Sequence, residues 1–264
     1  MLAILSPAKT LDFESKLTTK KYTEPSFVDE SSQLISTLKT LEPQDIASLM
    51  SISDNLAELN HRRYHEWQPR FDTPNFGTGA ARPAILAFKG DVYLGLQGPT
   101  MSERDLTWAQ KHIRILSGLH GLLRPLDRIH AYRLEMGTRL NTKHGANLYE
   151  FWGDKVATRL NDSLAEQHTG SGVPVLINLA SNEYYKVLAK GDINARVINV
   201  TFKEGKEGVY KFLSFFAKKA RGSMARYMVD QRVKSIRSLK AFDYDGYRYN
   251  AEMSVGDNWT FTRG

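Results

Sequence analysis

The sequence predicts a mixed α/β (α+β) fold in a single compact domain that spans residues 1–264. Short apolar, β-branched runs alternate along the chain with longer amphipathic stretches, and this interleaving is typical of α/β or α+β proteins rather than bundles. Hydrophobic residues make up 41% of the chain and charged residues 25%, as in ordinary globular proteins. No internal repeat or low-complexity tract divides the chain, so we expect one domain.

Apolar alternation and β-branched residues predict the strands. It predicts a hairpin at 242–249, turning at Asp245 and Gly246, and a short last strand at 259–262. The other predicted strands lie at 2–5, 84–88, 173–179, 195–201 and 209–216.

Helical periodicity with start signals fills the remaining stretches. Thr100 with Glu103, and Ser102 with Asp105, each offer a capping box to one helix. The stretch 69–83, rich in Pro and Gly, is expected to be a surface loop rather than an interdomain linker, because strands from both sides of it complete the sheet. The predicted helices lie at 27–41, 44–50, 54–68, 103–116, 147–166, 182–188 and 218–233.

Composition excludes several classes of protein. No apolar run reaches the roughly 18 residues that span a bilayer, and residues 1–7 lack a basic leader, so we expect a cytoplasmic protein without a membrane partner. The chain has no Cys, which excludes disulfides, thiolate nucleophiles and Cys-ligated metals. His61 and His65 have helical spacing but no third ligand near in sequence, which favours a polar helix face. We therefore predict no metal and no cofactor.

Positive charge is segregated along the chain. The net charge is +7, yet residues 201–240 hold 11 Lys and Arg against 3 Asp and Glu, and residues 111–145 hold 7 against 2. The remainder of the chain carries 18 basic and 24 acidic residues. Such segregation is the electrostatic footprint of a protein that binds phosphate polymers, although a basic face that only maintains solubility is the alternative.

A glycine-bounded turn lies in the first basic segment. Gly118 and Gly121 are expected between two helices, with Arg114, Arg124 and Arg128 nearby, and the pattern resembles a helix-hairpin-helix. Two glycines permit a tight turn, and the free N–H groups of a following helix bind phosphate. Two residues separate the glycines where the usual motif has one, and a plain turn between helices is the alternative.

The second basic segment follows an aromatic run and carries Lys218, Lys219, Arg221 and Arg226. In a helix, Lys219 and Arg226 are two turns apart on one face. Cations near a helix N-terminus oppose the helix dipole unless an anion compensates them. A bound phosphate would remove this conflict, and a solvated basic face is the alternative.

Polar residues at predicted strand ends suggest a third site. Lys and Arg side chains that meet carboxylates beyond strand ends would form a pocket able to hold an anion and move a proton. An ion-pair network with a purely structural role is the alternative. The residues concerned are Lys9, Asp91, Arg133, Glu135 and Glu183.

Seven strings stand out, in order along the chain: SPAKTLDF (6–13), FKGDVYLGL (88–96), LSGLHGLLRPLDRI (116–129), YRLEMG (132–137), LYEFWGD (148–154), NLASNEYYK (178–186) and AKKARGSMARYM (217–228). Together they resemble the YaaA family of bacterial peroxide-stress proteins. His120 departs from that family, which usually has Tyr at this position.

The resemblance implies an unusual α/β fold with a positively charged cleft, and DNA binding aided by a helix-hairpin-helix. It also implies a role in surviving hydrogen peroxide by limiting reactive intracellular iron. By this resemblance the predicted DNA contacts are Gly118, Gly121, Arg124, Lys218, Lys219, Arg221 and Arg226. We expect contacts to phosphates of double-stranded DNA, largely independent of base sequence. The alternative is an enzyme acting on a phosphorylated or nucleic-acid substrate at the strand-end residues.

Overall fold

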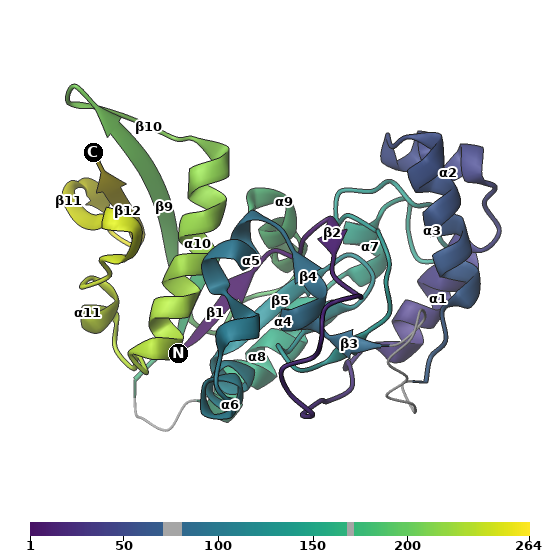
Figure 1. Cartoon of the computed structure of the whole chain (residues 1–264), viewed down its shortest axis with the longest axis horizontal. Coiled ribbons are helices and arrows are strands. Elements are labelled where there is room, and N and C mark those ends of the chain that lie inside the picture. The colour runs from purple at the N-terminus through teal and green to yellow at the C-terminus, as the bar shows by residue number, and fades with distance from the viewer. Residues whose placement is uncertain (71–80, 168–171) are drawn as a thin grey trace.

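The fold is given by a computed structural model, which describes residues 1–70, 81–167 and 172–264 (Figure 1). Most of the predicted loop at 69–83 lies outside the described residues. Within the described ranges, one eight-stranded sheet has the order β11-β12-β9-β8-β1-β5-β6, and β10 pairs with β9. The strands are β1 (Leu2–Leu5), β5 (Ile113–Ser117), β6 (Gly121–Leu123), β8 (Val175–Leu179), β9 (Arg196–Lys206), β10 (Val209–Lys211), β11 (Arg248–Val255) and β12 (Asn258–Arg263).

The centre of the sheet is parallel, and its ends are antiparallel. Strand β1 lies between β5 and β8 and is parallel to both, with Leu5 opposite Ile115 and Leu179. Strand β9 continues the parallel part beside β8 and β12. All four residues of β1 are 0% exposed, as expected for a parallel strand covered on both faces. The mixed α/β prediction is therefore confirmed.

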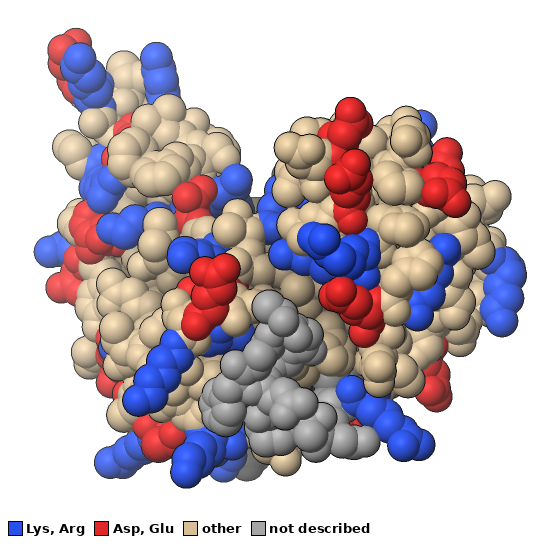
Figure 2. All heavy atoms as spheres, turned by 45° about the vertical axis from the view of Figure 1, so that its right-hand side comes forward, with Lys and Arg blue, Asp and Glu red and all other residues tan. Residues whose placement is uncertain are grey.

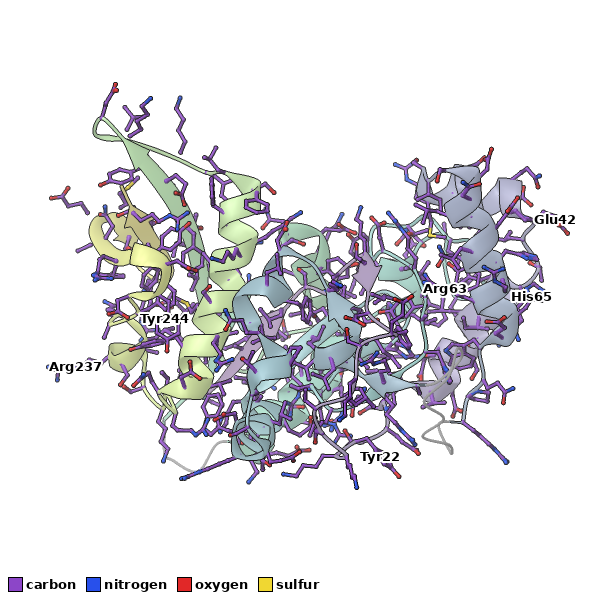
Figure 3. The ribbon with its side chains drawn as sticks, viewed as in Figure 1. Tyr22, Glu42, Arg63, His65, Arg237 and Tyr244 are labelled. Carbon is purple, nitrogen blue, oxygen red and sulfur yellow. The ribbon has the colours of Figure 1, made fainter. Side chains whose placement is uncertain are left out.

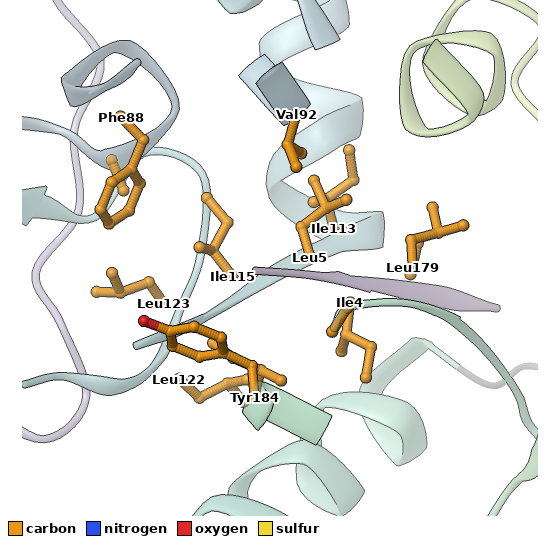
Figure 4. Close-up of a cluster of buried hydrophobic side chains, with 14 of the residues drawn as sticks. Ile4, Leu5, Phe88, Val92, Ile113, Ile115, Leu122, Leu123, Leu179 and Tyr184 are labelled. Atoms are coloured by element: carbon orange, nitrogen blue, oxygen red, sulfur yellow. The ribbon is translucent and has the colours of Figure 1, made fainter. Parts of the chain in front are cut away.

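Helices cover both faces of this central sheet. Figure 4 shows Leu5 and Val92 on one side of β1, and Ile4 and Tyr184 on the other. The first side is covered by α5 (Asp91–Leu96) and α10 (Ser214–Asp230), and the second by α8 (Lys155–Gln167) and α9 (Asn182–Tyr185). Adjacent β-strand residues point to opposite faces, which explains why Ile4 and Leu5 meet different helices.

The contact between α5 and α10 depends on two glycines. A Cβ atom on Gly222 of α10 would lie 1.7 Å from the carbonyl oxygen of Val92, and a Cβ on Gly95 of α5 would lie 2.1 Å from that of Lys219. No side chain fits at these distances, so the backbones of the two helices touch directly. Every larger residue at either position would push α10 away from the sheet.

The other elements surround this core. Helices α1, α2 and α3 form a separate lobe at the end of the molecule opposite β9 and β10 (Figure 1). None of the described helices is long and apolar enough to cross a bilayer. The bounds are α1 (Val28–Leu38), α2 (Pro43–Met50), α3 (Asp54–Glu66), α4 (Ala84–Ala87), α6 (Glu103–His112), α7 (Leu148–Trp152), α11 (Ile236–Leu239), 3-10 turns Gly98–Thr100, Lys186–Lys190 and Tyr244–Gly246, and the strand pairs β2 (Thr10–Leu11) with β4 (Phe88–Lys89) and β3 (Arg82–Pro83) with β7 (Arg128–Ile129).

Several predicted elements are confirmed, and three are wrong. Two more are only partly right: the predicted strand at 209–216 ends at Lys211 and residues 214–216 begin α10, and the predicted helix at 147–166 is divided into α7 and α8. Strands at 2–5, 175–179 and 258–263, the first three helices, and the capping box of Ser102 with Asp105 occur as expected. The predicted strand at 84–88 is mostly the helix α4. The predicted hairpin at 242–249 is a 3-10 turn, because the chain reverses later, between β11 and β12.

The predicted helix over 103–116 is the third error. It ends at His112, and the next residues form β5 in the middle of the sheet. Pairing of Ile113 with Ala3 and of Ile115 with Leu5 fixes this strand. A partner about a hundred residues away in sequence is invisible to local periodicity, which explains the error.

Candidate functional site

The glycine turn predicted as a helix-hairpin-helix has a different structure. Gly118 and Gly121 lie between the antiparallel strands β5 and β6, not between helices. A Cβ on Gly118 would lie 2.3 Å from the carbonyl oxygen of Leu134, and Gly121 has a φ of +62°. The backbone N–H of His120 donates to Ser117 at 2.9 Å, inside the protein. The two glycines therefore allow close packing in a buried turn. The prediction of a helix-hairpin-helix at this turn is wrong.

Arg124, predicted to add charge beside this turn, is held by an internal ion pair. Its guanidinium donates to the fully buried carboxylate of Asp127 at 3.0 Å through Nε and contacts the same oxygen at 2.9 Å through a terminal nitrogen. A second terminal hydrogen bond, 3.0 Å long, goes to the carbonyl oxygen of Glu24. Arg124 thus fastens the loop before α1 to the segment after β6.

Two of the predicted cations on α10 line one polar pocket, as their helical spacing predicted. Lys219 and Arg226 face this pocket, which has a volume of about 320 Å³. Each is neutralised there: Lys219 Nζ lies 3.0 Å from Asp245, and Arg226 Nε lies 2.8 Å from Asp230. The remaining lining residues are Gly95, Gln97, Ser223 and Tyr244. The pocket sits at the β11 end of the molecule, where Figure 3 labels Tyr244.

Asp245 is fixed firmly to α10. It accepts a hydrogen bond of 2.6 Å from Ser223 in addition to that from Lys219, and its backbone has a φ of +55°. Burial works to raise the pKa of Asp245, but the hydrogen bonds from Ser223 and Lys219 outweigh it and lower the pKa. A carboxylate that remains ionised keeps the charge of Lys219 compensated from within the protein.

The other two predicted cations of α10 differ from each other. Arg221 is half-buried, its burial lowers the pKa of the guanidinium, and its Nε has no hydrogen-bond partner among the described residues. Lys218 is exposed and has no ion pair within the described part of the chain. Of the four basic residues predicted on this helix, Lys218 alone combines exposure with an uncompensated charge.

Further uncompensated lysines lie on the ribbon that precedes α10. Lys203 and Lys206 lie on β9, and Lys211 ends β10. Together with Lys218 they form no ion pair with a described residue. We call these four residues the ribbon lysines. Lys203, Lys206 and Lys211 contribute to the positive charge of 201–240, but none of them was among the predicted site residues. The signal that could have identified them is their place just before a basic helix.

Figure 2 shows how charge is distributed on one face of the molecule. The surface is hollowed between two raised ends, and Lys and Arg side chains alternate there with Asp and Glu. The raised end on the left is the β9–β10 ribbon with α10, and the right-hand end is the lobe of α1 to α3. A uniformly basic cleft is not visible on this face, so the predicted basic cleft stays a prediction.

Three of the predicted strand-end residues meet in one cluster. Glu135 accepts from Lys9 at 2.7 Å and from the terminal nitrogen of Arg133 at 2.9 Å. Glu183 lies in α9, just after β8, where it accepts from the backbone N–H of Gly137 at 2.9 Å. The segment 133–137 therefore links the loop after β1 to the start of α9.

This cluster lies where parallel strands end. Ser6, directly after β1, accepts from the backbone N–H of Ser181, after β8, at 2.9 Å. Ligands of open α/β sheets commonly bind beyond the carboxyl ends of such strands. Asp91 starts α5 next to Gly90, whose Cβ position would be 3.3 Å from Ala8. No ion pair joins Asp91 to another described residue, so its membership in the cluster stays a prediction.

The structure supplies no described group of three His, Asp or Glu residues that would hold a metal ion. His61 and His65 contact each other with ring centroids 4.4 Å apart, and His65 Nδ1 lies 3.0 Å from the carbonyl oxygen of His61. His65 lies on the outer side of α3 (Figure 3). These contacts fit the predicted polar helix face.

Buried His120 makes stability depend on pH. Burial, with a smaller contribution from the nearby charge of His130, lowers its pKa to about 3 from 6.5. Between these values the unfolded chain binds a proton that the folded chain excludes, so stability falls as pH drops below 6.5. We expect His120→Gln to reduce the pH dependence of the unfolding free energy by about 1.4 kcal/mol per pH unit between pH 6 and 4.

Chemical denaturation at several pH values measures this difference. His65→Gln is the matched control, because it removes an exposed His and should leave the wild-type pH dependence unchanged. Equal slopes in the wild type and His120→Gln would show that His120 is protonated in the folded protein.

Comparison with known proteins agrees with the resemblance seen in the sequence. The family described as peroxide stress protein YaaA matches residues 1–253. A protein of Cellvibrio japonicus (strain Ueda107), described as "UPF0246 protein", is 50% identical over 263 residues, which cover 100% of this chain and 98% of the relative. The chain belongs to the peroxide stress protein YaaA family.

Proposed function

We propose that this protein binds double-stranded DNA during the peroxide response, through phosphate contacts that do not read base sequence. The proposal joins the family's description as a peroxide stress protein to the cations of the β9–β10 ribbon and α10. Protection of DNA, linked to limiting reactive intracellular iron as the resemblance implies, is the corresponding cellular role.

The ribbon lysines are the observation that carries this proposal. A lysine already paired with a carboxylate must lose that partner before it binds phosphate, whereas an unpaired lysine only releases solvent and counterions. Lys219 and Arg226 are paired with carboxylates, whereas the ribbon lysines have no ion pair with a described residue. Lys206, Lys211 and Lys218 are exposed, and all three lie within one short stretch of chain at one end of the sheet.

Salt dependence tests the proposal directly. Unrelated duplexes should bind with similar affinity, and log K should fall linearly with log salt. Replacing Lys206 and Lys211 by Gln together should reduce the magnitude of the slope by about 1.8, because each lost phosphate contact removes about 0.9. Fluorescence anisotropy with a labelled duplex at several salt concentrations measures both quantities.

The matched control is the pair Lys16→Gln and Lys20→Gln, which removes the same charge from exposed lysines elsewhere in the chain. This control should leave the slope near that of the wild type. Equal slopes in both double variants would assign binding to net charge alone, and binding that is insensitive to salt would exclude the proposal.

A second candidate function is catalysis on a phosphorylated or nucleic-acid substrate, favoured by the convergence of Lys9, Arg133 and Glu135 beyond the strand ends. A carboxylate held between two cations is positioned to accept a proton next to a bound anion. Glu135 keeps 20% of its side chain exposed, so a ligand reaches it.

Glu135→Gln separates this function from DNA binding. If the cluster is catalytic, the variant should lose most of the protection in a peroxide survival assay while duplex affinity stays unchanged, because loss of a general acid or base typically slows a reaction by about a hundredfold to ten-thousandfold. Its melting temperature serves as the control for folding, because Lys9 and Arg133 lose a partner. Full protection by a folded Glu135→Gln protein would make the cluster structural.

A further inference from the structure

An unusual group of apolar side chains is exposed where the β9–β10 ribbon meets α10. Five such residues occur within eight positions: Val209 is 56% exposed, Phe212 52%, Leu213 44%, Phe215 55% and Phe216 37%. Single exposed apolar residues are common, but a contiguous set on a soluble protein marks an interaction surface.

These side chains occupy the corner between two elements. Phe212 and Leu213 connect the end of β10 to the start of α10, and Phe215 and Phe216 lie in the first turn of that helix. The rings of Phe215 and Phe216 are edge to face with centroids 5.4 Å apart. Phe216 also lies 5.0 Å from the guanidinium of Arg263, which covers one side of its ring.

The ribbon lysines surround the same corner. Lys211 directly precedes Phe212, and Lys218 lies three residues after Phe215, on the same side of the helix. The ribbon's tip, with Lys206 and Glu207, projects furthest at this end of the molecule (Figures 1 and 2). The apolar corner is therefore recessed behind a charged tip and flanked by unpaired cations.

This arrangement fits a grooved polyanion better than a flat bilayer. A bilayer that received the phenylalanines would also bury the charged tip, since the tip extends beyond them, and burying such charges is costly. A DNA groove is wide enough for a two-stranded ribbon, and phosphates on both sides of the groove lie where lysines would reach them. Apolar side chains beside such lysines are the usual wedges of proteins that unstack base pairs.

We propose that Phe212 and Phe215 form a wedge that inserts between base pairs of the bound duplex and unstacks them. This inference rests on the proposed DNA binding. The wedge adds a contribution to the binding free energy that salt does not screen. Aromatic contact with an unstacked base contributes about 1–3 kcal/mol, which corresponds to roughly fivefold to 150-fold in affinity.

The test uses the full-length protein and a duplex that carries a fluorescent base analogue quenched by stacking. Wild-type protein should raise the emission on binding, and the double variant Phe212→Ala with Phe215→Ala should bind about tenfold or more weakly without raising it. The salt slope should stay as in the wild type, because no charge is removed. Leu94→Ala is the matched control, because Leu94 is 56% exposed on α5, outside the corner.

The outcomes distinguish the wedge from the proposed function. The wedge is excluded and DNA binding stands under one combination of results. In it, the Lys206 and Lys211 variant binds the duplex weakly, whereas the Phe212 and Phe215 variant matches the wild type in affinity and in emission of the base analogue. If the wild type binds no duplex but sediments with vesicles of anionic phospholipid, and the Phe variant does not, the corner is a membrane surface and both proposals fail.

Discussion

The direct backbone contact between α5 and α10 determines the position of everything that we assign to function. Gly95 and Gly222 have no side chains, so the two helices approach until backbone atoms touch. This brings α10 flat against the parallel sheet, where Ala217, Ala220 and Met224 are buried. Because β10 runs directly into α10, the same contact fixes the ribbon, the apolar corner and the ribbon lysines at one end of the molecule.

The basic residues of α10 differ in whether they are paired with an acidic residue. Toward β11 and the turn before it, Asp230 and Asp245 hold Arg226 and Lys219, and these pairs join the C-terminal strands to the helix. Toward the ribbon, Lys218 remains without an acidic partner among the described residues. The basic segment of the sequence thus contains both structural and available cations. The structural ones have an acidic partner, Asp230 four positions after Arg226 or Asp245 26 positions after Lys219.

Much of the fold was predictable because local patterns agree with the final contacts. The run Leu2–Leu5 reads as a buried strand and is one, and Ser102 with Asp105 marks the true start of α6. The errors arise where tertiary contacts override local pattern. Residues 113–117 continue a helical periodicity, yet their β-branched isoleucines pair with β1, and only that distant partner decides the strand.

The candidate sites were likewise predictable where local pattern agrees with the final contacts, and not where distant contacts decide. The meeting of Lys9, Arg133 and Glu135 agrees with their predicted grouping. Only Lys9 follows a strand of the central parallel sheet, however, whereas Arg133 and Glu135 follow β7 of a separate antiparallel pair. The ion pair of Lys219 did not follow, because nothing local indicates that Asp245 returns to α10. The pair of Arg226 with Asp230 has ordinary i,i+4 helical spacing, so the sequence did contain its signal. The turn at Gly118 failed for a different reason: glycines between apolar runs fit buried and exposed turns equally, and burial depends on Leu134 and Trp152 from elsewhere in the chain.

We propose that DNA contacts this protein at the ribbon and at the first turn of α10. Backbone hydrogen–deuterium exchange of the full chain, with and without a saturating duplex, distinguishes this surface from the strand-end cluster. We expect slower exchange across residues 203–218 in the presence of the duplex, and no change at 5–9 or 133–137. Slower exchange at the latter two segments, with none at 203–218, would show that the DNA binds at the strand-end cluster instead.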